Sequence, residues 1–114
     1  MTMNNERPIC EVDEYGNKHW YLNGKRHRVD GPAIEYADGS KEWYLNGNPH
    51  REDGPVLECA DGSKYWYLNG KRHREDGPAI EYASGNKEWW VDGEQIEVSD
   101  NDTFLRMINL KAFW

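Results

Sequence analysis

The chain has 114 residues, which fits one domain, and its formal net charge is −7 with the histidines neutral. This charge argues against nucleic acid or an anionic membrane as a partner, because both bind to a concentrated basic surface. Hydrophobic residues make up only 37%, and six Trp, seven Tyr and two Phe supply much of that fraction. Any core is therefore expected to be thin and aromatic, a composition that favours strands over helices.

Residues 1–7 are polar and lack the apolar stretch of a secretory signal, so we expect a flexible N-terminal tail. No apolar run in the sequence is long enough to span a bilayer. Cys10 and Cys59 occupy repeat positions two units apart, too far for a disulfide, so we expect both to be reduced. Reduced cysteines are typical of a cytoplasmic protein.

A 23-residue unit begins at Trp20 and recurs at Trp43, Trp66 and Trp89. The first copy is WYLNGKRHRVDGPAIEYADGSKE, and the next two copies are nearly identical to it. A partial unit starts at residue 8, and the fourth unit loses the pattern soon after its Asp-Gly pair. Chance does not supply three near-copies, so residues 8–98 are predicted to form one repeat domain.

Each unit contains three turn signals. Asn23-Gly24 and its equivalents predict a two-residue hairpin, because a type I′ turn needs positive φ at both central residues. Asp38-Gly39 and its equivalents predict a second hairpin, and the proline of Asp30-Gly31-Pro32 is expected at the first residue of a strand. The sequence therefore predicts an all-β fold, a single elongated antiparallel meander or solenoid of repeated β-hairpins.

A two-residue loop at Asp38-Gly39 would set the register of each unit and sort the side chains onto two faces. One face would be an apolar core stripe made of Ile34, Tyr36, Trp43, Leu45, Leu57, Cys59, Trp66, Leu68, Ile80, Tyr82, Trp89 and Val91. The other would be a solvent-exposed acidic aromatic face made of Tyr21, Tyr44, Tyr67, Trp90, Glu35, Glu42, Glu58, Glu81 and Glu88. In this register Glu35 lies opposite Glu42, and Glu81 lies opposite Glu88.

Residues 99–114 change character. Asp100 or Asp102 can cap a helix that begins near Thr103, and Phe104, Leu105 and Ile108 follow at helical spacing. Solenoids need atypical terminal units to cover an open apolar end. We therefore expect a short C-terminal capping helix with a tail that ends in Phe113-Trp114; a helix that docks a partner is the alternative.

The motif WYLNGKRHRVDGPAIEYADGSK resembles the MORN repeat (membrane occupation and recognition nexus), which shares the 23-residue period, the aromatic strand, the Asn-Gly turn and the later Asp-Gly hairpin. The resemblance covers roughly residues 8–98. MORN units usually place Gly where this chain has Arg28, Arg51 and Arg74 followed by Asp-Gly-Pro. The chain thus resembles a divergent MORN-like variant of phages and large DNA viruses, a resemblance that implies no defined activity.

The repeated charged residues are interpreted as scaffold. His27, His50 and His73 occupy one slot in successive units, too far apart to share a metal ion, so we expect them to close turns by hydrogen bonds. Arginines and aspartates at equivalent positions are expected to form a repeated loop clamp: Arg28 with Asp30, Arg51 with Asp53, and Arg74 with Asp76. No nucleophile elbow or phosphate loop is present, so the sequence predicts no enzyme, no metal site and no cofactor.

We expect a non-catalytic protein-binding module, because Trp and Tyr dominate interface energetics. Its candidate binding residues are those of the acidic aromatic face, and its expected partner is a protein with a basic surface rather than nucleic acid or a membrane. The finer hypothesis is a phage or other viral factor that binds and inhibits a protein in the host cytoplasm. The alternatives are a structural or self-associating repeat, including a homo-oligomer, and a small-ligand or nucleotide binder.

The middle unit differs from its neighbours at Asn48-Pro49, Val56-Leu57, Cys59 and Tyr65. These changes make the tip of that unit less basic and the rest of it more apolar. Drift and selection explain them equally well at the level of sequence.

Overall fold

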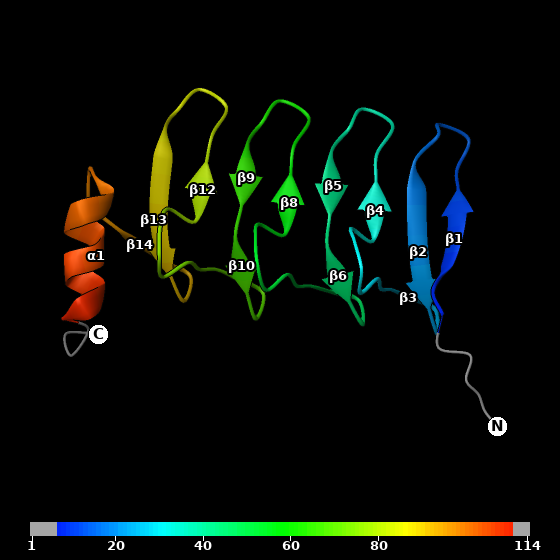
Figure 1. Ribbon diagram of the computed structural model, residues 1–114, viewed down its shortest axis with the longest axis horizontal. Helices are drawn as coiled ribbons and strands as arrows, with labels where there is room; N and C mark the ends of the chain where they lie inside the picture. The colour runs from blue at the N-terminus through cyan, green and yellow to red at the C-terminus, as the bar shows by residue number, and fades with distance from the viewer. Residues whose placement is uncertain (1–6, 111–114) are drawn as a thin grey trace.

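The computed structural model describes residues 7–110 as an elongated, strand-rich molecule with one helix at its far end (Figure 1). Residues 1–6 of the tail predicted at 1–7, and the terminal residues 111–114 with Phe113-Trp114, lie outside the described residues. The strands are β1 (Ile9–Val12), β2 (Lys18–Leu22), β3 (Lys25–Arg26), β4 (Ile34–Glu35), β5 (Lys41–Glu42), β6 (Tyr44–Leu45), β7 (Asn48–Pro49), β8 (Leu57–Glu58), β9 (Lys64–Tyr65), β10 (Tyr67–Leu68), β11 (Lys71–Arg72), β12 (Ile80–Glu81), β13 (Lys87–Val91) and β14 (Glu94–Ile96), and the helix is α1 (Asn101–Asn109).

The main sheet has ten strands, in the order β1-β2-β4-β5-β8-β9-β12-β13-β14, with β3 paired to β2. Within residues 7–110 all of its strand pairings are antiparallel, and each repeat unit adds two strands to the row seen in Figure 1. β6–β7 and β10–β11 form separate two-stranded hairpins below the sheet. The predicted elongated antiparallel meander is confirmed.

The Asn-Gly pairs form the expected tight turns. Asn23 and Gly24 have φ angles of 54° and 79°, and the pairs at 46–47 and 69–70 repeat these values closely. Only Gly and a few short polar residues adopt positive φ readily, which explains why Asn and Gly recur here. We call the hairpins around residues 23–24, 46–47, 69–70 and 92–93 the tip hairpins.

The Asp-Gly loop is one residue longer than predicted. Tyr36 N donates to Ser40 O at 2.9 Å, so the loop contains residues 37–39, with Gly39 at a φ of 97°. This is the three-residue hairpin in which a residue of positive φ follows a turn. Consequently Glu35 pairs with Lys41 and Ile34 with Glu42, and the predicted opposition of Glu35 to Glu42 is wrong. Glu81 likewise pairs with Lys87, not with Glu88.

A shift of one residue moves a whole strand's side chains to the other face of a sheet. The face that we call the tyrosine face contains Tyr21, Ile34, Tyr36, Glu42, Tyr44, Leu57, Cys59, Tyr65, Tyr67, Ile80, Tyr82, Glu88 and Trp90. The opposite face, the tryptophan face, contains Trp20, Ala33, Glu35, Lys41, Trp43, Val56, Glu58, Lys64, Trp66, Ala79, Glu81, Lys87 and Trp89.

The core lies where the strands follow Asp-Gly-Pro. Ala33 and Ile34 are 0% and 2% exposed, although adjacent strand residues point to opposite faces, and Ala79 and Ile80 repeat this pair. Both faces of the sheet are therefore covered at these strands. The predicted single core stripe is wrong in part, because it missed the alanines and included Leu68, which is 45% exposed.

The C-terminal helix forms as predicted and covers the last repeat unit. Asp100 is its N-cap, and its side chain accepts a hydrogen bond from Thr103 N at 2.8 Å. Phe104 is fully buried, with its ring centroid 6.4 Å from that of Trp89. Within residues 7–110, no helix has the length and apolar character needed to cross a membrane.

Candidate functional site

The nine candidate binding residues do not share one face. Six of them lie on the tyrosine face: Tyr21, Glu42, Tyr44, Tyr67, Glu88 and Trp90. Glu35, Glu58 and Glu81 lie on the tryptophan face, opposite lysines of neighbouring strands. The prediction that all nine residues lie on one acidic aromatic face is therefore wrong, because the Asp-Gly loop is one residue longer than predicted. Whether these residues bind a partner stays a prediction.

On the tyrosine face, Glu42 is held by two phenols. Tyr36 Oη donates to Glu42 Oε2 at 2.8 Å, and Tyr44 Oη donates to Glu42 Oε1 at 2.7 Å. Burial, together with the bond to this carboxylate, raises the pKa of Tyr36 and of Tyr44 to about 12. Glu42 and both hydroxyls are thus satisfied within the fold.

The same arrangement recurs 46 residues later and is missing between the two copies. Glu88 accepts from Tyr82 Oη at 3.1 Å and from Trp90 Nε1 at 2.9 Å. In the middle unit, Tyr65 stands in the glutamate slot and Cys59 in the slot of the first phenol, and Tyr65 instead packs edge-on against Tyr82. The tyrosine face therefore follows a period of two units.

On the tryptophan face, each of the three full units contains an arginine clamp. In the first, the Arg28 guanidinium Cζ lies 3.8 Å from the Trp20 ring centroid. Arg28 Nε donates to Asp30 Oδ1 at 3.1 Å, and Nη1 donates to Pro32 O at 3.1 Å and to Glu35 Oε2 at 3.0 Å. Stacking on an aromatic ring and several charge-assisted bonds hold this side chain in one position.

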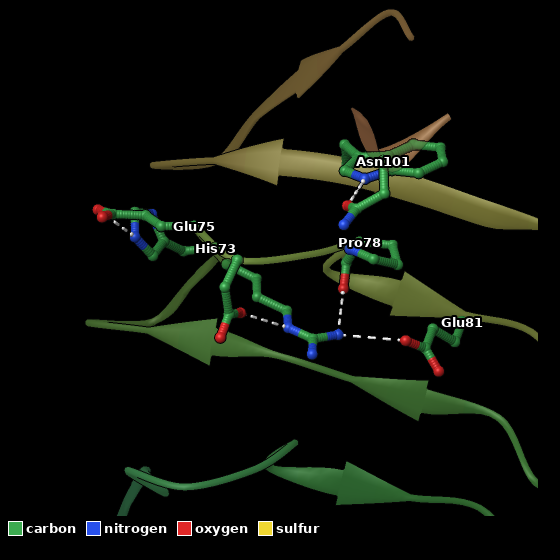
Figure 2. Close-up of polar contacts among 8 residues, drawn as sticks. His73, Glu75, Pro78, Glu81 and Asn101 are labelled. Atoms are coloured by element: carbon green, nitrogen blue, oxygen red, sulfur yellow. Dashed lines mark hydrogen bonds and ion pairs between the residues drawn. The ribbon is translucent and has the colours of Figure 1, made fainter. Parts of the chain in front are cut away.

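The clamp is repeated in the next two units, and Figure 2 shows polar contacts of the third copy, including those to Pro78 and Glu81. Arg51 bonds Pro55 O and Glu58, and Arg74 bonds Asp76, Pro78 O and Glu81 at 2.9 to 3.1 Å. The predicted arginine–aspartate clamp is confirmed. The sequence interpretation missed its glutamate and tryptophan members, although each glutamate follows its arginine by seven residues in all three units.

Lysines lie opposite these same glutamates across the sheet. The register places one charge on each strand in the alternating order Lys18, Glu35, Lys41, Glu58, Lys64, Glu81 and Lys87. Opposite charges on neighbouring strands stabilise a sheet by a few tenths of a kcal/mol up to about 1 kcal/mol. The three clamp glutamates are thus neutralised within the fold.

The outward charge of the clamp loops is acidic. The arginine side chains are 22 to 23% exposed, whereas the side chains of Asp30, Asp53 and Asp76 are 84 to 91% exposed. Glu52 and Glu75 add side chains that are 87% and 57% exposed. We call these five carboxylates the acidic loop row. Since each unit adds two strands about 4.8 Å apart, successive loops lie about 10 Å apart.

Grooves lie between successive clamp loops. One of about 570 Å³ lies between the first and second clamps and is lined by Arg28, Trp43 and Asp53 among others. Another of about 600 Å³ lies between the second and third clamps and is lined by Arg51, Trp66 and Leu68 among others. Each groove therefore combines aromatic surface with a rim of charged side chains.

The repeated histidines bond neighbouring units together. His27 Nδ1 accepts from Asn46 N at 3.0 Å, and His73 Nδ1 accepts from Asp92 N at 2.9 Å. The predicted turn-closing role is confirmed for these two residues, and the turn that each contacts belongs to the next unit. Within residues 7–110, no three His, Cys, Asp or Glu side chains gather to hold a metal ion. Cys10 and Cys59 are free thiols.

Comparison with protein-family models and with curated proteins finds no match to this chain. The geometry of the repeat is therefore the basis for a functional proposal.

Proposed function

We propose that the protein is a non-catalytic protein-binding repeat module whose partner presents a basic surface. The observation that carries the proposal is the acidic loop row, in which carboxylates point outward while the arginines of the same loops are turned inward onto tryptophan rings. The clamp loops contain both arginine and acidic residues, but the acidic side chains are the more exposed ones. The surface that a partner would contact is therefore acidic. A regular row of like charges steers the encounter with an oppositely charged protein and fixes its register.

The proposal of a binding role also rests on the repetition itself. A catalytic constellation is a single arrangement of different groups, whereas here one clamp recurs three times with the same arginine bonds to a proline carbonyl and to a glutamate. Solenoid proteins use such repetition to present an extended binding surface. The finer proposal, a viral factor that inhibits a host protein, is supported by the MORN-like resemblance alone.

The test reverses charge outside the arginine clamp. Within the described residues, the ion-pair partners of Glu52 and Glu75 are histidines, at 3.5 and 3.2 Å, so these two glutamates are separate from the arginine clamp. Glu52→Lys with Glu75→Lys should change the free energy of unfolding by no more than about 0.5 kcal/mol, as is usual for exposed positions. The same variant should lose proteins that the wild-type chain retains from a lysate.

The matched control is Glu14→Lys with Glu94→Lys, which changes the net charge equally at exposed positions outside the loop row. We expect the control to retain the same proteins as the wild type, and added salt to weaken retention by both. If the control and the loop variant lose the same proteins equally, only net charge matters, and a specific acidic surface is excluded.

Self-association through β1 is the second candidate function. β1 is the first strand in the order of the main sheet, and its Ile9 and Val12 are 67% and 62% exposed. An exposed edge strand with apolar side chains pairs readily with another chain. A molar mass that stays monomeric by light scattering at high protein concentration would exclude this candidate.

A further inference from the structure

Neighbouring tip hairpins are bonded together at two of the three junctions between the successive units that begin at Trp20, Trp43, Trp66 and Trp89. At the first junction Arg28 N donates to Tyr44 O at 3.2 Å, and Gly47 N donates to Arg26 O at 2.8 Å. The third junction repeats both bonds, from Arg74 N to Trp90 O at 3.1 Å and from Gly93 N to Arg72 O at 2.9 Å. With the histidine bonds described above, each of these closed junctions has three hydrogen bonds, two between main-chain groups and one from a main-chain N–H to a histidine ring.

The middle junction, between the β6–β7 and β10–β11 hairpins, is open. Within residues 7–110, none of the three equivalent bonds is formed: Arg51 N with Tyr67 O, Gly70 N with Pro49 O, and Asn69 N with His50 Nδ1. The opposite ends of the same units remain joined, because Ser40 Oγ accepts from Ala60 N and Ser63 Oγ accepts from Ala83 N, each at 2.9 Å. The opening is therefore confined to the tips.

The amino-acid changes of the middle unit explain why this junction is open. At the first junction the Lys25 side chain lies against Gly47, with its Cβ 3.6 Å from where a Gly47 Cβ would stand. At the third, Lys71 lies against Gly93 in the same way. Asn48-Pro49 replaces this Lys-Arg pair in the middle unit. Apart from the chain neighbours of Gly70, no atom of the described part of the chain lies within 4 Å of the corresponding point at Gly70.

The open junction is a groove whose main chain, among the residues that the structure describes, is unpaired on both sides. A volume of about 530 Å³ is lined there by Leu45, Asn46, Asn48, Pro49, His50, Asn69 and Gly70, and the 600 Å³ groove of the tryptophan face lies on the same two units. Each side offers a donor and an acceptor, Arg51 N with Pro49 O on one hairpin and Gly70 N with Tyr67 O on the other. An extended peptide needs such alternating groups on both of its edges.

We propose that this groove binds an extended, basic segment of the partner protein, which inserts as a strand between the β6–β7 and β10–β11 hairpins (Figure 1). The charge of the adjoining surface selects the chemistry, because Glu52, Asp53 and Asp76 line the 600 Å³ groove and are largely exposed. Leu68, 45% exposed, supplies an apolar contact for a side chain of the inserted strand. This inference rests on the proposed function, since it names the part of the partner that is bound.

The first experiment measures hydrogen exchange of three equivalent amides in the unliganded protein. Gly47 and Gly93 donate to carbonyls of the preceding unit and should exchange slowly, whereas Gly70 should exchange at least tenfold faster. The variant Asn48→Lys with Pro49→Arg restores the residues of the neighbouring units and should slow exchange at Gly70. Equal protection of all three amides in the wild type would show that the junction is closed, which overturns the inference.

The second experiment titrates the protein with the acetylated heptapeptide Lys-Val-Lys-Val-Lys-Val-Lys and follows backbone amides by NMR. We expect the shifts of Asn69, Gly70 and Arg51 to change while those of Gly47 and Gly93 stay constant. The closing variant Asn48→Lys with Pro49→Arg should weaken binding at least tenfold, and so should N-methylation of alternate peptide bonds. The inference is overturned if the closing variant or N-methylation of the peptide leaves the affinity unchanged. It is also overturned if a peptide with Glu in place of Lys binds equally well.

Failure of this inference is distinguishable from failure of the proposed function. If the peptide leaves Gly70 unperturbed but the Glu52→Lys with Glu75→Lys variant still loses proteins that its charge-matched control retains, the binding surface stands and the groove is not its site. If that variant and its control behave alike, the proposed function itself fails.

Discussion

The guanidinium Cζ of Arg51 lies 3.7 Å from the centroid of the Trp43 ring. Gly54 packs against the guanidinium, so closely that a Cβ at this position would lie 2.7 Å from Arg51 Cζ. The glycine of each Asp-Gly-Pro motif is therefore required for space, since it has no positive φ angle to accommodate. This relationship explains why tryptophan, arginine and Asp-Gly-Pro recur together in every clamp.

Gly54→Ala should lower the free energy of unfolding by about 1–3 kcal/mol, the usual cost of forcing extra atoms into a packed site. The reason is that Arg51 cannot move away without losing its bonds to Pro55 O and Glu58, at 3.0 and 2.7 Å. Urea denaturation of Gly54→Ala, Arg51→Ala and the double variant measures the effect. In the Arg51→Ala background the alanine should cost almost nothing, and an equal cost in both backgrounds would contradict the clamp.

Tyr44→Phe should destabilise the protein by about 1 kcal/mol, since it removes a hydrogen bond and leaves Glu42 with one phenol donor in place of two. Tyr67→Phe is the matched control, because Tyr67 occupies the same slot one unit later and its hydroxyl donates no hydrogen bond within residues 7–110. Thermal melts of both variants provide the measurement. Equal losses at the two positions would contradict the assigned role of Glu42.

The same cluster predicts a response to alkaline pH. Tyr36 and Tyr44 have their pKa raised to about 12 in the folded protein, against about 10 in an unfolded chain. The pKa of each phenol is higher in the folded protein than in the unfolded chain. The two protonated phenols therefore contribute fully to the free energy of unfolding below about pH 10, and this contribution is lost as the pH rises towards 12. Tyrosinate absorbance should therefore show a group of phenols that ionise late. In Glu42→Gln this late group should shrink, and an unchanged titration would contradict the prediction.

The repeat, the Asn-Gly turns and the helix cap could be predicted because each depends on a local rule. The register could not, because Asp38-Gly39 is compatible with both a two-residue and a three-residue loop, and the difference of one residue decides which face Glu42 occupies. The clamp was only half predicted. Arg28 and Asp30 are near in sequence, whereas its contact with Trp20 depends on how the loop folds over the strand.

The open middle junction could not be predicted from composition, because it arises from the loss of contacts between units. Asn48-Pro49 is visible in the sequence, but its consequence depends on the position of Gly70 in the next hairpin. The two-unit period was also visible, since residues 26, 36 and 42 recur at 72, 82 and 88 and not between them. Only the hydrogen bonds of Glu42 and Glu88 give this alternation a physical meaning.

At the end of the repeat, the C-terminal helix takes the place of the arginine clamp. The fourth unit has Glu97 in the slot that Arg74 occupies in the third, so the Trp89 ring has no arginine of its own unit above it. Trp89 Nε1 donates instead to Asn101 Oδ1 at 3.0 Å, and the Phe104 side chain is buried beside the Trp89 ring. Phe104→Ala should therefore cost about 3–5 kcal/mol, the usual effect of truncating a buried aromatic side chain.

Leu110→Ala is the matched control, since Leu110 ends the same helix and is 58% exposed, and it should cost less than about 0.5 kcal/mol. Urea denaturation followed by tryptophan fluorescence measures the free energy of unfolding of both variants. If α1 only docks a partner and does not cap the sheet, Phe104→Ala will melt like Leu110→Ala. A large loss of unfolding free energy in Phe104→Ala alone means that the helix covers the Trp89 ring, as the clamp arginines cover the rings of Trp20, Trp43 and Trp66.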